Sequence, residues 1–191
     1  MTIRVVIAED EAIIRLDLRE TLEEEGYDVV AETGRGDEAI EMARELRPDL
    51  AVLDIGMPGM DGLEAARLMV GEQLCGVLIL TAFSQRELIE QARDAGALAY
   101  LVKPFQKSDL IPAIEVALGR FAELTALERD VEDLQARLEA RKNIDRAKGR
   151  LMDEHGLAEQ DACRFLQQQA MANRVKIDEI ARRVVDGELT P

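Results

Sequence analysis

Five side chains that could carry out phosphoryl chemistry stand at the ends of short apolar runs of the sequence. Glu9 and Asp10 follow the first run, Asp54 the third, Thr81 the fourth and Lys103 the fifth. Clustered carboxylates repel one another unless a cation neutralises them, and a site built from oxygen ligands suits Mg²⁺. A deprotonated Asp could then attack a phosphorus atom while the ion and Lys103 absorb the developing charge. The pattern predicts a magnesium-dependent phosphoryl acceptor.

The apolar runs predict the strands that would position these side chains. They lie at residues 3–8, 29–31, 50–53, 77–80 and 98–102, and amphipathic stretches lie between them at residues 11–24, 37–46, 63–70 and 85–95. Strands that are apolar on both faces and alternate with helices are typical of a doubly wound α/β fold with a five-stranded parallel sheet. Ligands bind outside the carboxyl ends of such strands, so the side chains should converge there. For any one of these side chains, simple capping of a strand end is the alternative interpretation. It is a poor explanation for suitable side chains at four strand ends together.

After about residue 107 the sequence predicts only helices. Leu124, Leu127, Val131, Leu134 and Leu138 follow the 3-4-3-4 spacing of a coiled-coil seam. A single amphipathic helix packed on its own chain is the alternative interpretation. Three short amphipathic helices are expected next, around residues 144–152, 162–170 and 177–185, and their apolar faces should be buried together as a small bundle.

Composition and charge exclude some classes of protein and divide the chain. One His and two distant Cys exclude a His-based metal site, a disulfide scaffold and a zinc fold. No apolar run approaches the roughly 20 residues of a membrane span and no signal peptide is evident, so a cytoplasmic protein without a membrane partner is expected. Residues 1–140 carry 14 basic and 30 acidic side chains, a net charge of −16, whereas residues 141–191 carry 10 and 9, a net of +1. This asymmetry indicates two modules with different partners.

The motifs around the five side chains resemble the receiver domain of two-component response regulators. The resemblance rests on residues 5–11, 54–62, 81–82 and 100–105, and it covers residues 1 to about 120. It implies a flavodoxin-like fold in which Asp54 accepts a phosphoryl group from a sensor histidine kinase. Such a protein is not a conventional enzyme, because it catalyses only its own phosphorylation and dephosphorylation.

The same resemblance implies a role for each residue of the site. Asp10 and Asp54 would bind Mg²⁺ together with the backbone carbonyl of Gly56, and Glu9 would act through water. Thr81 and Lys103 would contact the phosphoryl oxygens, Tyr100 would be an aromatic switch, and the Lys103–Pro104 peptide bond would be cis.

The tail resembles the ANTAR domain of RNA-binding transcription antiterminators over roughly residues 130–187. The match rests on residues 141–152, on Ala162, Leu166 and Ala170, and on the helix near 177–181. It implies contacts to RNA hairpins from Arg141, Lys142, Arg146, Ala147, Lys148 and Gly149. Small residues on either side of Lys148 would let an RNA backbone approach closely. Arg150 stands where the family usually has an apolar residue, and the sequence assigns it no role.

The sequence therefore predicts a receiver at residues 1–120, a coiled-coil linker at 121–140 and an RNA-binding ANTAR domain at 141–191. Phosphorylation of Asp54 would favour a homodimer that binds RNA hairpins and prevents termination of transcription. The alternative is a phosphorelay or interaction regulator whose helical tail docks a protein partner. A DNA-binding regulator is least favoured, because no helix-turn-helix pattern is present.

Overall fold

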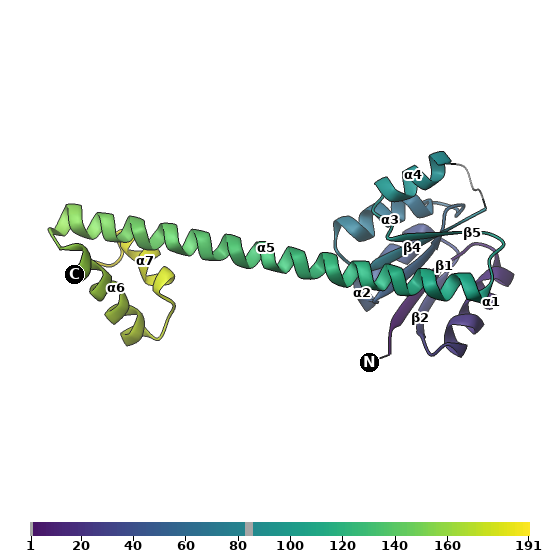
Figure 1. Cartoon of the computed structure of the whole chain (residues 1–191), viewed down its shortest axis with the longest axis horizontal. Coiled ribbons are helices and arrows are strands. Elements are labelled where there is room, and N and C mark those ends of the chain that lie inside the picture. The colour runs from purple at the N-terminus through teal and green to yellow at the C-terminus, as the bar shows by residue number, and fades with distance from the viewer. Residues whose placement is uncertain (1, 83–85) are drawn as a thin grey trace. The chain divides into compact units, whose positions relative to one another are not determined.

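The computed structural model describes residues 2–82 and 86–191. Its first unit contains a five-stranded parallel sheet in the order β2-β1-β3-β4-β5 (Figure 1). The strands are β1 (Arg4–Ala8), β2 (Asp28–Thr33), β3 (Leu50–Asp54), β4 (Gly76–Thr81) and β5 (Ala99–Val102). The predicted doubly wound sheet is confirmed, and each strand contains most of the apolar run that predicted it.

Helices cover both faces of this sheet, and each face has its own apolar core. The helices are α1 (Ala12–Glu24), α2 (Gly36–Leu46), α3 (Gly62–Gly71), α4 (Arg86–Asp94) and α5 (Lys107–His155). α2, α3 and α4 pack on one face through residues such as Ile40 and Met69. α1 and the first turns of α5 pack on the other through Leu18, Leu22 and Ile114. The predicted start of the fourth helix at Gln85 lies outside the described residues.

The order of the strands reverses between β1 and β3, which places a topological switch point beside their carboxyl ends. Ala8 at the end of β1 pairs with Leu53, the last residue but one of β3. Thr81 at the end of β4 pairs with Val102 at the end of β5. Because these ends are level across the sheet, the residues at or just after them share one edge.

α5 is one continuous helix of 49 residues, from Lys107 to His155. The prediction of a separate short helix around residues 144–152 is wrong, because these residues form the last turns of α5. No Gly or Pro stands between residues 120 and 148, so nothing in the sequence interrupts the helix there. The helix does end at the predicted place, where Gly156 has a φ of 66° that favours glycine.

The last turns of α5 form a small bundle with α6 (Glu159–Asn173) and α7 (Ile177–Val185). Its apolar core is a separate cluster of buried residues, which are Ala147, Leu151, Ala162, Leu166, Ala170, Ile180, Ala181 and Val184. The predicted joint burial of three amphipathic faces is confirmed. The chain divides into two compact units, Met1–Thr125 and Ala126–Pro191.

The predicted seam of α5 remains exposed. The exposed fractions of Leu124, Leu127, Val131, Leu134 and Leu138 lie between 48% and 63%. Within each of the two units, the described residues leave the stripe exposed, and both the seam and the helix packed on its own chain remain predictions. Five apolar side chains in one exposed stripe fit a face that pairs with another helix.

Candidate functional site

The predicted carboxylates come together at the carboxyl edge of the sheet. Ligand atoms of Glu9, Asp10 and Asp54 all lie within 4.8 Å of one another. Glu9 and Asp54 are buried, whereas Asp10 is exposed. Thr81 is buried at the end of β4, and its carbonyl oxygen accepts a hydrogen bond of 2.7 Å from the backbone N–H of Lys103. Four strand ends therefore contribute to one site.

Lys103 links the two buried carboxylates. Its Nζ lies 2.6 Å from Glu9 Oε2 and 2.5 Å from Asp54 Oδ1. Burial alone would lower the pKa of Lys103, but the contacts with Asp54 and Glu9 outweigh it and the net pKa is raised. The ammonium is therefore charged at neutral pH and opposes the negative charge of the site. The Lys103–Pro104 peptide bond is cis, as the resemblance implied.

The donor set fits a hard divalent cation such as Mg²⁺. All three acidic side chains offer oxygen ligands. The pKa of Glu9 is raised, first because the carboxyl group is buried and then because the charge of Asp54 is near. The contact with Lys103 lowers this pKa but does not outweigh the other two effects. Glu9 Oε2 is buried without a hydrogen bond of acceptable geometry, even though the Lys103 ammonium is close. The Lys103 ammonium, 2.6 Å away, supplies positive charge to this buried oxygen, and a bound divalent cation would add to it. Glu9, Asp10 and Asp54 are thus the residues of the described chain that could hold the ion.

Two glycines allow the backbone around Asp54 to close tightly. The N–H of Gly56 donates a 2.7 Å hydrogen bond to Asp54 Oδ2. A Cβ on Gly62, the first residue of α3, would lie 2.0 Å from the carbonyl oxygen of Asp54. The preceding residue, Asp61, caps α3 by accepting a 2.7 Å hydrogen bond from the backbone N–H of Glu64. The start of α3 therefore packs directly on the backbone of the central carboxylate.

Sequence reasoning missed Arg15, which supports the same edge. Its Nη1 atom donates a 2.5 Å hydrogen bond to the carbonyl oxygen of Glu9 and lies beside Gly34. This contact ties α1 to the end of β1 and puts a positive charge next to the acidic cluster. An Arg one turn into a helix gives no sequence signal for such a bond, because the bond depends on where the helix packs.

The basic residues expected in the tail lie at the end of α5 but differ in their surroundings. Arg141 and Arg146 are exposed and make no hydrogen bond or ion pair to any described residue. Lys142 pairs with Glu139 at 2.7 Å. Lys148 is largely covered and contacts two carboxylates. The structure thus brings these cations onto one helix end, where both lysines already pair with carboxylates.

The two small residues beside Lys148 do not share one role. Ala147 is fully buried in the core of the bundle, so the prediction that it lets RNA approach is wrong: its methyl group packs against α6 and α7 instead. Gly149 faces the other way, and a Cβ at this position would meet no atom within 4 Å. Only the surface at Gly149 is open to a close approach.

Two family models match the chain, and they match different parts of it. The model of the response regulator receiver domain matches residues 5–115, and the model of the ANTAR domain matches residues 132–185. The chain belongs to the response regulators. Both resemblances seen in the sequence are confirmed, and the second unit of the structure contains the whole ANTAR match.

Related proteins support the same assignment. The "Transcriptional regulatory protein PdtaR" of Mycobacterium tuberculosis is 53% identical over 188 residues, which are 98% of this chain and 92% of that protein. The "Chemotaxis protein CheY" of Thermotoga maritima is 36% identical over 112 residues, which are 58% of this chain and 93% of CheY. The solved receiver domain of the putative response regulator NarL from Mycobacterium tuberculosis superimposes with a TM-score of 0.59 at 28% identity, covering 62% of this chain and 97% of that one.

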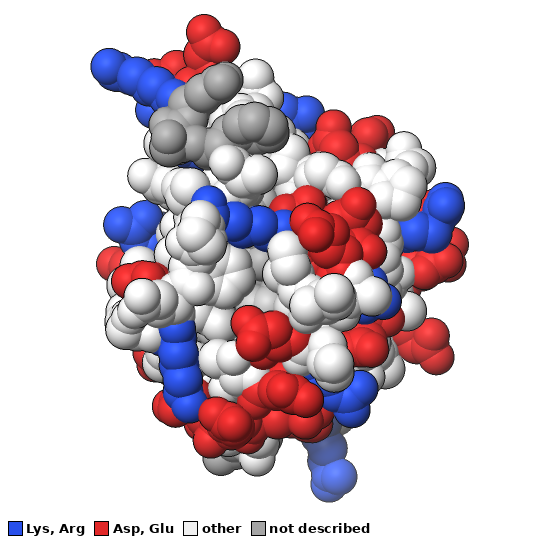
Figure 2. Space-filling model, turned by 90° about the vertical axis from the view of Figure 1, so that its right-hand side faces the viewer, with Lys and Arg blue, Asp and Glu red and all other residues white. Residues whose placement is uncertain are grey.

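The receiver surface of this response regulator is rich in acidic side chains. Figure 2 shows them in patches on one face, with basic side chains scattered between them. Residues 1–125 carry 12 basic and 25 acidic side chains, and this net charge of −13 makes the first unit unfavourable for a polyanion. None of the helices in residues 2–82 and 86–191 has both the length and the apolar character needed to cross a membrane.

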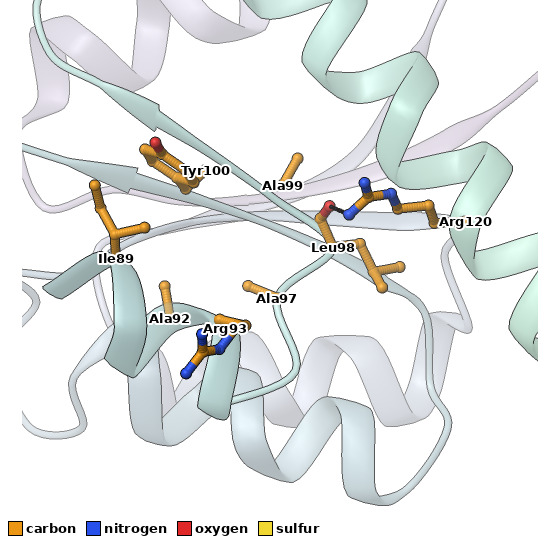
Figure 3. A pocket seen from close by; sticks show the side chains of 8 residues that line it. All are labelled: Ile89, Ala92, Arg93, Ala97, Leu98, Ala99, Tyr100 and Arg120. Atoms are coloured by element: carbon orange, nitrogen blue, oxygen red, sulfur yellow. Dashed lines mark hydrogen bonds between the residues drawn. The ribbon is translucent and has the colours of Figure 1, made fainter. Parts of the chain in front are cut away.

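The proposed switch residue, Tyr100, lies on β5, an edge strand of the sheet. Its side chain is 45% exposed and borders a pocket with Ile89 and Ala92 of α4 (Figure 3). Arg120 of α5 lines the same pocket and donates a 3.4 Å hydrogen bond to the carbonyl oxygen of Leu98. Tyr100 therefore has space beside it on the surface formed by α4, β5 and α5.

Arg150, to which the sequence assigned no role, joins two helices of the ANTAR domain. Its Nη1 atom donates to the carbonyl oxygens of Val184 and Val185 at the end of α7, the second being the shorter bond. Its Nε pairs with Glu154 at 2.9 Å. The guanidinium thus bonds carbonyl groups in the last turn of α7, where intrahelical donors run out; the Val184 carbonyl also accepts a 3.1 Å hydrogen bond from the N–H of Gly187. An apolar residue could not make these bonds, and the role of Arg150 here is structural.

Proposed function

We propose that a sensor histidine kinase phosphorylates this response regulator on Asp54 and that its ANTAR domain then binds RNA hairpins as a transcription antiterminator. The observation that carries the proposal is the convergence of Glu9, Asp10, Asp54 and Lys103 at one edge of the sheet, in a chain whose second family match is an ANTAR domain. The receiver supplies the control and the tail supplies the output.

The chemistry follows from the partners of Asp54. A carboxylate oxygen of Asp54 attacks the phosphorus, the P–N bond to the histidine of the kinase breaks, and the electron pair stays on the imidazole nitrogen. Lys103 offsets negative charge on the transferred group from its position 2.5 Å from Asp54 Oδ1. Thr81, at the adjacent strand end, is proposed to contact a phosphoryl oxygen. Bound Mg²⁺, held by Glu9, Asp10, Asp54 and the backbone of Gly56, would supply further charge neutralisation.

The proposed output depends on the surface around Tyr100 and on α5. The pocket beside Tyr100 gives its ring a place to move when Thr81 engages the phosphoryl group. A change at α4, β5 and α5 would favour pairing through the exposed seam of α5, because that stripe of apolar side chains is exposed within each of the two units. The homodimer would present two ANTAR domains to paired RNA hairpins.

The RNA contact is proposed for the exposed cations at the end of α5, with Arg146 central. The test uses the full chain, treated with acetyl phosphate and Mg²⁺, and a pool of hairpin RNAs with a fixed stem and randomised loops. Arg146→Ala should weaken binding by about 1–3 kcal/mol if the side chain makes a close base or phosphate contact. Arg183→Ala is the matched control, because Arg183 lies in the last turn of α7 and should matter less.

The outcomes of this test separate the candidate functions. Hairpin RNA should bind more tightly than duplex DNA of the same stem sequence, and added salt should weaken the complex. Because an A-form stem exposes little sequence information, some loops of the pool should be enriched over others. Absence of binding at low salt would instead favour the regulator whose tail docks a protein.

A further inference from the structure

Lys148 of the ANTAR domain is held between two carboxylates. Its Nζ lies 3.0 Å from Glu159 Oε1, in the first turn of α6, and 3.3 Å from Asp145 Oδ1, one turn earlier on α5. The hydrogen bonds to Glu159 and Asp145 raise the pKa of Lys148. The side chain of Lys148 is only 21% exposed, whereas that of Glu159 is 69% exposed. The carboxylate of Glu159 thus lies on the solvent side of the pair and partly covers the cation.

Two arginines on the same end of α5 are open to solvent. Arg141 and Arg146, on the same helix end, are exposed and without a hydrogen bond or ion pair to the described residues. Space beside Gly149 is also open. Lys142 pairs with Glu139 of its own helix, whereas Lys148 has an acidic side chain from another helix in front of it.

A carboxylate and a phosphate oxygen are interchangeable partners for an ammonium group. Lys presents a compact charge with three donors that can rotate, so exchanging one anion for another needs no fixed bidentate geometry. Glu159, whose side chain is 69% exposed, loses little when it returns to water, and a polyanion that also contacts the exposed Arg141 can displace it from Lys148. The pair is thus weak enough to open when RNA arrives.

We propose that Glu159 occupies the place of an RNA phosphate on Lys148 and that RNA binding exchanges this carboxylate for a phosphate oxygen. The inference rests on the proposed RNA-binding function and deepens it. Glu159 holds Lys148 in position in the free protein and also lowers the affinity for RNA. A ligand must place a phosphate at Lys148 to recover the lost contact, so the exchange disfavours anions that bind only the two arginines.

The test compares two substitutions that remove one negative charge from the first turn of α6. Glu159→Gln removes the carboxylate that faces Lys148. Asp161→Asn is the matched control, because Asp161 pairs at 3.1 Å with Arg164 of its own helix. Binding of the full chain to the fixed-stem, randomised-loop hairpin RNA pool is measured by fluorescence anisotropy, and thermal unfolding verifies that each variant is folded.

Glu159→Gln should bind this RNA about 1.5- to 5-fold more tightly than wild type, the range that corresponds to an exposed ion pair. Asp161→Asn should give a smaller gain, which measures the general effect of one fewer negative charge. The gain from Glu159→Gln should disappear in a Lys148→Ala background, because the two residues act on each other. Glu159→Lys should give a larger gain than Glu159→Gln.

An equal or weaker affinity of folded Glu159→Gln relative to Asp161→Asn would overturn the proposal and leave the pair as a purely structural contact. A gain that persists without Lys148 would overturn it as well. Failure of the wild-type chain to bind any RNA of the pool is a separate result, because it contradicts the proposed function before the exchange is tested.

Discussion

Asp54 uses both of its carboxylate oxygens within the receiver. Oδ1 contacts Lys103 Nζ and Oδ2 accepts the hydrogen bond from Gly56. Asp54→Asn keeps the shape of the side chain but replaces one oxygen by an amide that cannot attack phosphorus. Incubation with acetyl phosphate and Mg²⁺ should add one phosphoryl group to the wild type and none to this variant, as measured by intact-protein mass spectrometry.

Asp10→Ala provides the comparison for this experiment. It removes an exposed oxygen ligand and leaves Asp54 in place, so labelling should become much slower without being lost. Full labelling of Asp54→Asn would show that another residue is the acceptor.

Gly62 gives a stability prediction because it touches the backbone of Asp54. A methyl group at this position would lie 2.0 Å from the Asp54 carbonyl oxygen, and the contact cannot be relieved by moving a flexible side chain. Gly62→Ala should lower the free energy of unfolding by about 1–3 kcal/mol, as measured by urea denaturation. It should also slow phosphorylation.

Gly71, at the other end of α3, is the matched control. A Cβ there would meet no atom within 4 Å, so Gly71→Ala should leave stability unchanged or raise it by up to about 1 kcal/mol. Equal stability of the two variants would mean that the tight start of α3 is not required by the fold.

The site residues of the receiver were predictable because strand ends place them. The contact of Arg15 with Glu9, and in the ANTAR domain that of Lys148 with Glu159, were not predictable, because both depend on how separate helices pack. Ala147 was assigned wrongly for another reason. The motif alone assigned it to the RNA surface, although its spacing from Ile144 and Leu151 places it on the apolar face of the helix, and the structure buries it.

At the scale of elements, the alternation of strands and helices was predictable from hydrophobic periodicity alone. Buried strands such as β3 and β4 produce continuous apolar runs, so their positions were clear. The continuation of α5 through residues 144–152 was not recognised, because the change from seam to basic motif suggests a boundary. A helix can continue when its apolar residues move to another face. It ends where a residue such as Gly156 stops it.

The exposed seam of α5 predicts the oligomeric state. The unphosphorylated chain should be mainly monomeric or weakly dimeric, and the phosphorylated chain should sediment as a dimer. Changing Leu127 and Leu134 together to Asp would bury charge in the paired seam and should prevent dimerisation. Analytical ultracentrifugation measures this directly.

Ala126→Asp is the control for the seam, because this exposed residue is adjacent to Leu127 but off the stripe. It should dimerise like the wild type. Identical sedimentation before and after phosphorylation would instead indicate a rearrangement within one chain.

At the scale of the whole molecule, the two domains differ in their relation to a polyanion. The receiver repels RNA through its net negative charge, so affinity must come from a local surface of the ANTAR domain. A fragment from Ala126 onward, which has its own closed core, should bind the hairpin RNA pool at least as well as the unphosphorylated full chain. Weaker binding by the folded fragment would show that the receiver contributes directly to the contact.

The central claim is that phosphorylation of Asp54 controls RNA binding by the ANTAR domain. The most direct measurement is the affinity of the full chain for the hairpin RNA pool with and without acetyl phosphate, for the wild type and for Asp54→Asn. We predict that acetyl phosphate tightens binding by the wild type and has no effect on Asp54→Asn. Equal affinity of the phosphorylated and unphosphorylated wild type, or the same increase in Asp54→Asn, would contradict the account.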